Sequence, residues 1–270
     1  MIARHGLSAR KSLGQHFLLD RNLTDRIARA AGGLAQGTVI EIGPGPGGLT
    51  RALLAADTQR LVAVEKDPRC REALEELRRA FPERLTLVDA DALTVDVRDL
   101  GPPPRRIVAN LPYNVASALL VQWLTLIAEA PGALADLVLM FQKEVALRLC
   151  AAPGGKDYGR LSVLTQWLAT PDVLFHVPAR AFTPPPKVTS TVLRLTPHAR
   201  PLHPAPRARL EQVTAAAFGQ RRKMLRQSLK TLPVDAGALL AAAAIPGTAR
   251  AEQLSVSEFC ALARALAAMT

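Results

Sequence analysis

The sequence predicts an α/β fold, with a mainly parallel sheet covered by helices and a small all-helical domain after it. Between Thr38 and Leu195, short β-branched runs alternate with helical stretches, which is typical of parallel sheets. The following segment, TPHARPLHPAPR, holds four prolines and no apolar periodicity, and helical spacing resumes beyond it. We therefore expect a sheet domain over residues 1–196 and a helical domain over residues 197–270.

Seven strands are expected in the sheet domain. A proline-rich segment, AFTPPPKV, separates the last two in place of a helix, so we expect an antiparallel strand near the sheet edge. The expected strands are Thr38–Ile42, Leu61–Glu65, Leu85–Val88, Arg106–Ala109, Asp136–Phe141, Val173–Val177 and Thr189–Leu195. The helices expected in the second domain are Leu210–Phe218, Gln220–Leu232 and Ser255–Ala268, the last with a capping box between Ser255 and Glu258.

Composition excludes several classes of protein. Of 270 residues, 49% are hydrophobic, which is enough to fill a core and excludes disorder as the main state. No clean apolar run approaches about 20 residues, and no apolar stretch follows the basic N-terminal segment, so we expect a cytoplasmic protein without a membrane span. Cys70, Cys150 and Cys260 lie too far apart in sequence to suggest a disulfide framework or a metal site.

The charge points to a polyanionic partner. The chain carries 34 Lys and Arg against 23 Asp and Glu, a net charge of +11. Residues 197–270 hold 10 of the basic residues and only 4 acidic ones, so the excess is concentrated in the helical domain. Nucleic acid is the partner that such an excess favours, although Arg, Ala, Pro and Gly are all abundant here, a bias that the base composition of a genome can also produce.

A glycine-rich segment follows the first expected strand. In VIEIGPGPGGLT, a strand leads into Gly43, Gly45, Gly47 and Gly48 and then into a helix. Glycines at this place let the backbone approach a ligand closely. The spacing fits both the dinucleotide pattern Gly-x-Gly-x-x-Gly and the Gly-x-Gly-x-Gly of methyltransferases, and a tight structural turn is a third reading. The glycines alone leave the ligand open.

Three carboxylates near the glycines narrow this choice. Glu65 ends the second strand, where it can accept hydrogen bonds from ribose hydroxyls in either nicotinamide or S-adenosylmethionine enzymes. Glu41 directly precedes the glycines, where it would repel a pyrophosphate and attract a sulfonium and an ammonium group. Asp91 follows the third strand and can accept from an adenine amino group, unless it simply faces water. Together the charges favour S-adenosylmethionine.

The fourth strand ends in the tetrapeptide Asn110-Leu111-Pro112-Tyr113. An adenine amino nitrogen is a poor nucleophile because its lone pair is delocalised into the ring. If the Asn110 side-chain oxygen and the Leu111 carbonyl accept hydrogen bonds from that amino group, the lone pair is freed for a methyl group. Pro112 stiffens the turn and has no N–H to compete for the carbonyl. Tyr113 can stack on a base that has left its helix.

With these motifs the sequence resembles the ribosomal RNA adenine N6-dimethyltransferase family over nearly its whole length. The similar segments are GQHFL (14–18), EIGPGPG (41–47), NLPY (110–113), FTPPPKV (182–188) and FGQRRKML (218–225). The resemblance implies a Rossmann-like seven-stranded class I methyltransferase sheet with S-adenosylmethionine as methyl donor and no metal. It further implies N6-dimethylation of two adjacent adenosines in a hairpin loop near the 3′ end of 16S rRNA, within the 30S particle, by a monomer that also serves small-subunit biogenesis.

The resemblance also assigns roles to single residues. His16 and Leu18 would contact the methionine end of the cofactor, and because the family often has Asn at position 16, either the side chain or the backbone of His16 is the contact. Phe182 would face Tyr113 across the flipped adenine. The remaining cofactor residues would be Gly43 and Gly45 in the cleft, Glu65 on the ribose, Asp91 on the adenine, and Asn110 between cofactor and base.

Basic residues in two segments are expected to bind RNA phosphates. Arg222, Arg226 and Lys230 have the spacing of one helix face. The full set is Arg221, Arg222, Lys223 and Arg226 in the second domain, with Arg10 and Lys11 near the N-terminus. A helix face that is simply solvated is the alternative interpretation of the basic residues in the second domain.

Three other functions stay open at this point. A 23S rRNA adenine methyltransferase of the macrolide-resistance type would share the glycine motif and a similar tetrapeptide, and the run QRRKML argues against it. A non-catalytic RNA-binding factor of ribosome assembly would have no need of Glu65, Asp91 and Asn110. A nicotinamide dehydrogenase would bind NAD in place of S-adenosylmethionine.

Overall fold

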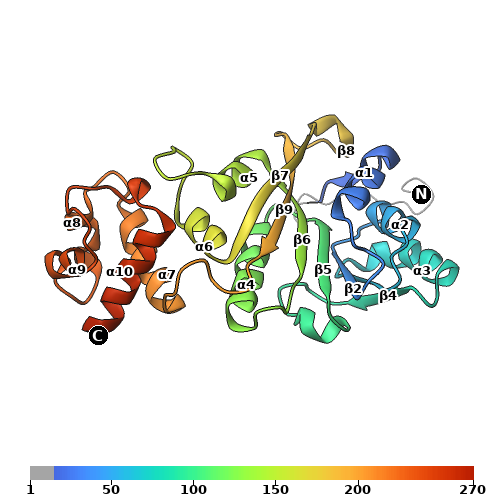
Figure 1. Ribbon diagram of the computed structural model, residues 1–270. Coiled ribbons are helices and arrows are strands. Elements are labelled where there is room, and N and C mark those ends of the chain that lie inside the picture. The colour runs from blue at the N-terminus through green and yellow to red at the C-terminus, as the bar shows by residue number, and fades with distance from the viewer. Residues whose placement is uncertain (1–14) are drawn as a thin grey trace. The chain divides into compact units, whose positions relative to one another are not determined.

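The computed structural model describes residues 15–270, which form two compact units (Figure 1). The first contains the described residues up to Ala146 together with Asp172–Pro197, and the second contains Leu147–Pro171 and His198–Thr270. The expected boundary near residue 196 coincides with the one after Pro197. Leu147–Pro171, which we expected in the first domain, groups with the second because its helix α6 (Arg160–Leu168) contacts the C-terminal helices.

The first unit is built on a seven-stranded sheet, which confirms the predicted α/β fold class. The strand order is β4-β3-β2-β5-β6-β9-β7, in which β2 to β6 are parallel and β9 runs antiparallel to β6. The strands are β2 (Thr38–Ile42), β3 (Leu61–Glu65), β4 (Leu85–Asp89), β5 (Arg105–Asn110), β6 (Asp136–Gln142), β7 (Ala169–Val177) and β9 (Ser190–Pro197). Each contains or overlaps an expected strand.

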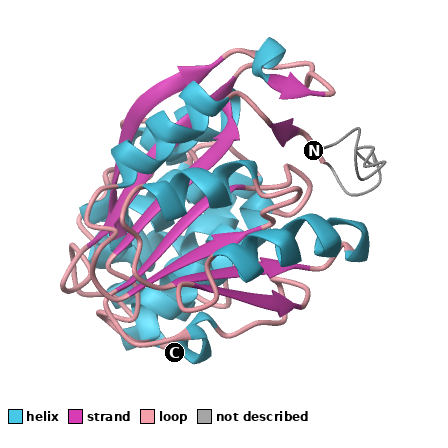
Figure 2. Ribbon diagram, turned by 90° about the vertical axis from the view of Figure 1, so that its right-hand side faces the viewer, coloured by secondary structure: helices cyan, strands magenta, loops and turns pink. Residues whose placement is uncertain are grey.

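Helices cover both faces of this sheet (Figures 1 and 2). Side chains of one face, such as Val39 and Val108, form one buried cluster with those of α1 (Arg21–Ala31), α2 (Gly48–Ala55) and α3 (Arg71–Ala80). The alternating side chains, such as Ile40 and Ile107, are equally buried on the other face, where Figure 1 shows α4 (Ala116–Glu129). Burial on both faces explains why the parallel strands read as continuous apolar runs.

A second, two-stranded sheet joins the start of the described chain to the proline-rich segment. Strand β1 (Phe17–Leu18) pairs antiparallel with β8 (Phe182–Thr183), with Leu18 opposite Phe182. We did not expect this pair from the sequence, because each strand is only two residues long and carries no periodicity. Its effect is to hold residues 15–18 beside the glycine-rich segment.

The second unit is helical, and one of its three expected helices is absent. Its helices are α6, α7 (Arg207–Gly219), α8 (Leu225–Ser228), α9 (Ala236–Ala242) and α10 (Val256–Met269), and α5 (Lys143–Cys150) spans the boundary between the units. Helix α10 has the predicted capping box, because the Ser255 Oγ accepts from the Glu258 N–H at 3.2 Å and the Glu258 carboxylate accepts from the Ser255 N–H at 2.7 Å. No helix within residues 15–270 is both long and apolar enough to cross a membrane.

The predicted helix over Gln220–Leu232 is wrong. Residues 220–223 form a turn, Met224 makes a β-bridge with Arg250, and only the single turn of α8 and a 3₁₀ turn follow. The Leu225 N–H donates to the Ala249 carbonyl at 2.8 Å, so tertiary pairing replaces the hydrogen bonds of a continuous helix. Arg222, Arg226 and Lys230 therefore do not share a helix face.

Candidate active site

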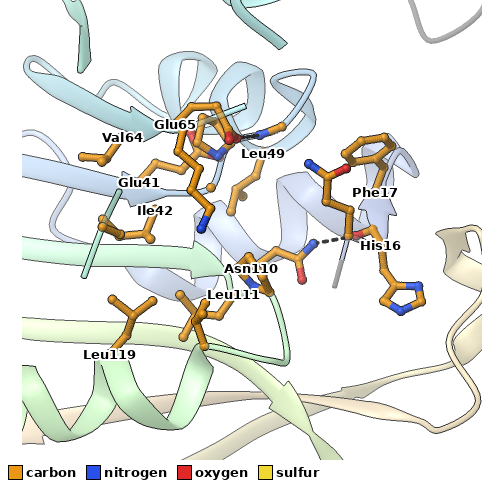
Figure 3. A pocket seen from close by; sticks show the side chains of 18 of the residues that line it. His16, Phe17, Glu41, Ile42, Leu49, Val64, Glu65, Asn110, Leu111 and Leu119 are labelled. Atoms are coloured by element: carbon orange, nitrogen blue, oxygen red, sulfur yellow. Dashed lines mark hydrogen bonds between the residues drawn. The ribbon is translucent and has the colours of Figure 1, made fainter. Parts of the chain in front are cut away.

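One pocket lies at the carboxyl ends of the parallel strands, the usual place for a ligand in an open α/β sheet. The glycine segment follows β2, Glu65 ends β3, Asp91 follows β4, and Asn110 ends β5. The expected residues that line this pocket are His16, Leu18, Gly43, Gly45, Glu65, Asp91, Asn110, Leu111, Pro112 and Tyr113. Residues from four strand ends and from the N-terminal motif thus meet in one cavity (Figure 3).

Two glycines of this segment leave little or no room for a side chain. Gly45 has a φ of +55°, and a Cβ there would come within 3.1 Å of the Phe17 ring. Its N–H donates to the Glu65 Oε2 at 2.9 Å, so the loop and the carboxylate hold each other (Figure 3). A Cβ on Gly48 would overlap the Leu18 carbonyl. These close approaches explain Gly45 and Gly48 without a pyrophosphate.

The second carboxylate oxygen of Glu65 is also held in place. Glu65 Oε1 accepts from the backbone N–H of Asp67 at 2.8 Å. Burial raises the pKa of Glu65, while the hydrogen bonds from Asp67 and Gly45 lower it. The carboxylate therefore stands in a fixed orientation at the pocket wall, as recognition of a pair of hydroxyl groups requires.

Glu41 is a buried carboxyl group with an unsatisfied oxygen. It lines the pocket, its side chain is 1% exposed, and its Oε2 has no hydrogen-bond partner among the described residues. Burial is the main cause that raises its pKa from an ordinary value of 4.5 to about 8, against a smaller lowering by the neighbouring Thr50 hydroxyl. A buried acceptor without a donor is costly, and a cationic ligand would satisfy it and favour its ionised form. We expected Glu41 to carry a charge from its sequence position; in this site the charge depends on what binds.

Asp91 lies at the mouth of the pocket beside a lysine. Its Oδ2 accepts from the Lys66 Nζ at 3.1 Å, and its Oδ1 accepts from the Leu93 N–H at 3.0 Å. The Leu93 hydrogen bond is the main cause of its lowered pKa, so Asp91 is an ionised acceptor at neutral pH. Lys66 is a neighbour that no sequence pattern singled out.

The Asn110 amide is oriented by the N-terminal motif. Its Nδ2 donates to the His16 carbonyl at 3.1 Å, which leaves the Oδ1 available as an acceptor in the pocket (Figure 3). The sequence did not show whether the side chain or the backbone of His16 acts in the site. In the structure its backbone carbonyl binds Asn110. Its imidazole Nδ1 lies 2.8 Å from the Pro184 carbonyl, so the ring is tied to the proline-rich loop.

Tyr113 is held at the pocket edge. Its hydroxyl lies 2.5 Å from the Ser190 Oγ, and burial raises its pKa. The His16 ring is 5.4 Å from the Tyr113 ring, at an interplanar angle of 34°. An aromatic surface is therefore fixed beside Asn110.

The structure does not place Phe182 opposite Tyr113. Phe182 is 3% exposed, belongs to the hydrophobic core and does not line the pocket. The physical reason is the pairing of β8 with β1, which sets Phe182 directly opposite the buried Leu18. Its ring packs in the core here, and a role in stacking on the target base stays a prediction.

The basic residues of the second unit differ in their surroundings. Arg221 donates to the Gly155 carbonyl at 3.1 Å and lies 4.0 Å from a Glu252 carboxylate oxygen, so it braces its own unit. Arg222, Lys223 and Arg226 are exposed. The expected contacts Arg10 and Lys11 fall outside the described residues. Within residues 15–270, no group of three or more His, Cys, Asp or Glu is arranged to hold a metal ion.

Sequence reasoning missed three connected side chains next to the pocket. The Gln15 amide donates to the Asp67 Oδ2 at 2.8 Å, and Arg69 donates to the Gln15 Oε1 at 3.2 Å. Gln15 belongs to the GQHFL motif, and Asp67 stands two residues after Glu65. These positions next to expected site residues were the only signal that the sequence offered for them. Their contact depends on the fold and could not be read from spacing.

Known proteins resemble this chain along its whole length. A family model described as ribosomal RNA adenine dimethylase matches residues 6–268. A ribosomal RNA small subunit methyltransferase A from Rhodospirillum rubrum is 61% identical, covering 98% of this chain and 91% of its own. One of that name from Paramagnetospirillum magneticum is also 61% identical, covering 100% of this chain and 94% of its own.

Two solved structures share the fold. A dimethyladenosine transferase from Plasmodium falciparum superimposes with a TM-score of 0.76 at 24% identity, covering 92% of this chain and 96% of its own. The 23S rRNA methyltransferase ErmE has a TM-score of 0.66 at 30% identity, covering 93% and 99%. These matches confirm the resemblance drawn from the motifs. The chain is a methyltransferase and belongs to the ribosomal RNA adenine dimethylase family.

Proposed function

We propose that this protein transfers methyl groups from S-adenosylmethionine to N6 of two adjacent adenosines near the 3′ end of 16S rRNA, in the cytoplasm, with the 30S particle as substrate. The observation that carries the proposal is the Asn110 amide, whose nitrogen is bound to His16 so that its oxygen is presented to the pocket. An acceptor at this point suits an amino group that must lose its conjugation with the ring.

The pocket suits S-adenosylmethionine in its charges and its backbone. When bound, S-adenosylmethionine supplies the methyl group that the adenine nitrogen accepts. The unsatisfied oxygen of Glu41 would meet the cationic end of the ligand, and Glu65 would bind the ribose hydroxyls. Asp91 would accept from the adenine amino group, sharing its carboxylate with Lys66. A dinucleotide would set a pyrophosphate against Glu41, which would then lack the cationic partner that favours its ionised form.

The tetrapeptide would hold the target base. Asn110 Oδ1 and the Leu111 carbonyl would accept from the two N6 hydrogens, and Tyr113 would stack on the unpaired base. Orientation of this kind can supply roughly 7–11 kcal/mol of a barrier, so no covalent step by the protein is needed. Stacking of a base on an aromatic ring contributes about 1–3 kcal/mol.

The exposed basic residues of the second unit would bind RNA phosphates. Arg222, Lys223 and Arg226 are exposed and near one another in sequence, which suits a backbone read through its phosphates. Arg221 would support this segment from within. The small-subunit substrate is supported by the names of the 61%-identical relatives, whereas the 23S enzyme is matched at 30% identity and stands as the second candidate.

Transfer of labelled methyl from S-adenosylmethionine tests the proposal. The wild type, Asn110→Ala and Asn114→Ala are each incubated with three substrates: unmethylated 30S particles, naked 16S rRNA and 23S rRNA. Asn114 is an exposed neighbour that does not line the pocket, so it is the matched control. We expect label in 30S particles, a loss on the order of 10²–10³ for Asn110→Ala and near-normal transfer for Asn114→Ala. Label in 23S rRNA alone would establish the second candidate, and no label anywhere would refute methylation of these RNAs.

A further inference from the structure

Residues 15–18, the N-terminal strap, form part of the wall of the active-site pocket. All four line the pocket, and none belongs to the main sheet. The Phe17 ring lies against Gly45, and the Leu18 carbonyl lies against Gly48, so the strap packs on the glycine segment. Its position decides which groups the pocket presents.

The Gln15 amide clamps one end of the strap. Its nitrogen donates to Asp67 Oδ2 at 2.8 Å, and its oxygen accepts from Arg69 at 3.2 Å. Asp67 is 5% exposed and is bound by Arg69 through both carboxylate oxygens, which lowers its pKa to about 2. The clamp is therefore charged on both sides across the neutral pH range, and such hydrogen bonds are roughly twice as strong as neutral ones.

The next residue of the strap holds the catalytic amide. The His16 carbonyl accepts from Asn110 Nδ2 at 3.1 Å, near the upper end of good N–H···O distances. Because consecutive Cα atoms are only about 3.8 Å apart, a movement of Gln15 is passed directly to the His16 carbonyl. A displacement of about 0.5 Å would take this hydrogen bond out of its normal range.

The clamp also touches the ribose side of the pocket. The Asp67 N–H donates to Glu65 Oε1, and Glu65 Oε2 accepts from Gly45. Hydrogen bonds thus connect the Glu65 carboxylate through Asp67 to Gln15, the peptide chain connects Gln15 to His16, and the His16 carbonyl binds Asn110. The two ends of this connection are the groups expected at the cofactor and at the target base.

We propose that Gln15 is a positioning residue, which fixes the rotational state of the Asn110 amide by clamping the strap to Asp67 and Arg69. Without the clamp, the His16 carbonyl no longer selects the amide nitrogen, and the amide can turn its NH₂ toward the target amino group, where it offers no acceptor. The inference rests on the proposed function for its kinetic consequence only. Its structural consequence, the state of the Asn110 amide, needs no substrate.

The test combines a double-mutant cycle with a spectroscopic measurement on the full-length protein. Gln15→Leu removes both clamp hydrogen bonds while keeping a side chain of similar size. Gln59→Leu is the matched control, because Gln59 is an exposed glutamine whose amide donates to the Asp57 carbonyl. We expect Gln15→Leu to lower kcat at least tenfold while the KM for the RNA changes less than threefold. In the Asn110→Ala background the same substitution should lower kcat less than twofold, because the amide that it positions is gone.

The Asn110 side-chain amide can be observed by NMR in protein labelled with ¹⁵N asparagine, and its signal is assigned by its loss in Asn110→Ala. Gln15→Leu should shift this signal and speed its exchange with water, and Gln59→Leu should leave it unchanged. An unshifted signal overturns the proposal, as does an equal loss of kcat in both backgrounds. If the wild type methylates no RNA, the proposed function fails, and the NMR result still decides the role of Gln15.

Discussion

Replacing Glu41 with glutamine should stabilise the protein, by an amount that grows with pH. The carboxyl group is 1% exposed with an unsatisfied Oε2, and burial raises its pKa from 4.5 to about 8. At a pH between these two pKa values, Glu41 has lost its proton in the unfolded chain and keeps it in the folded protein. Ionisation of Glu41 therefore favours the unfolded state increasingly as pH rises from 4.5 to 8, and stability that is complete below pH 4.5 is lost across this window.

The size of the effect follows from the two pKa values. Each unit of pKa difference corresponds to about 1.36 kcal/mol, so the wild type loses about 3 kcal/mol between pH 4.5 and 7 and about 4 kcal/mol by pH 8. A glutamine side chain has nearly the same shape as that of Glu41 and does not titrate. The difference between variant and wild type from this cause should be under about 1 kcal/mol at pH 5 and about 3 kcal/mol at pH 7.

Urea unfolding of the wild type and Glu41→Gln at pH 5, 6, 7 and 8 measures this difference. Glu83→Gln, at an exposed carboxylate of the same unit, is the control and should show no such growth with pH. A Glu41→Gln advantage that stays constant from pH 5 to 8 would refute the assignment of Glu41 as a buried acid with a raised pKa.

Three further outcomes are expected. The affinity of the wild type for S-adenosylmethionine should rise with pH up to about 8, because the cationic ligand favours ionised Glu41 and ligand binding therefore releases the Glu41 proton. Calorimetry in buffers of different ionisation enthalpy measures this proton release, and Glu41→Gln should abolish the release. Arg222→Ala and Lys223→Ala should each reduce the slope of log affinity against log salt by roughly 0.7–0.9 in titrations with 16S rRNA; unchanged slopes would remove these residues from the interface. Phe182→Ala should lower the free energy of unfolding by about 3–5 kcal/mol, as measured with urea; a loss of turnover at full stability would instead restore its role at the base.

The sheet and most of the pocket could be predicted because their signals are local. The parallel strands are buried on both faces, so each appears as an apolar run, and a ligand at their carboxyl ends must contact the residues that end or follow them. Gly43, Glu65, Asp91 and Asn110 each stand at such a point, and the structure brings them together.

The features that the sequence did not predict depend on contacts between segments that are distant in the chain. Apolar spacing over Gln220–Leu232 fits a helix, but the bridge between Met224 and Arg250 ends it, and nothing within the segment announces that partner. The burial of Phe182 and the clamp on Gln15 both depend on where the strap lies. A motif shows that a residue stands in a family pattern, while its partner follows only from the fold.

The central claim is that this pocket makes dimethyladenosine in the small-subunit RNA. The most direct measurement is nucleoside analysis by mass spectrometry of 16S rRNA from unmethylated 30S particles treated with the wild type or with Asn110→Ala. We predict N6,N6-dimethyladenosine at two adjacent positions near the 3′ end for the wild type, and little or none for the variant in the same time. Monomethyl products alone, methylation elsewhere in the RNA, or equal products from both proteins would contradict the claim.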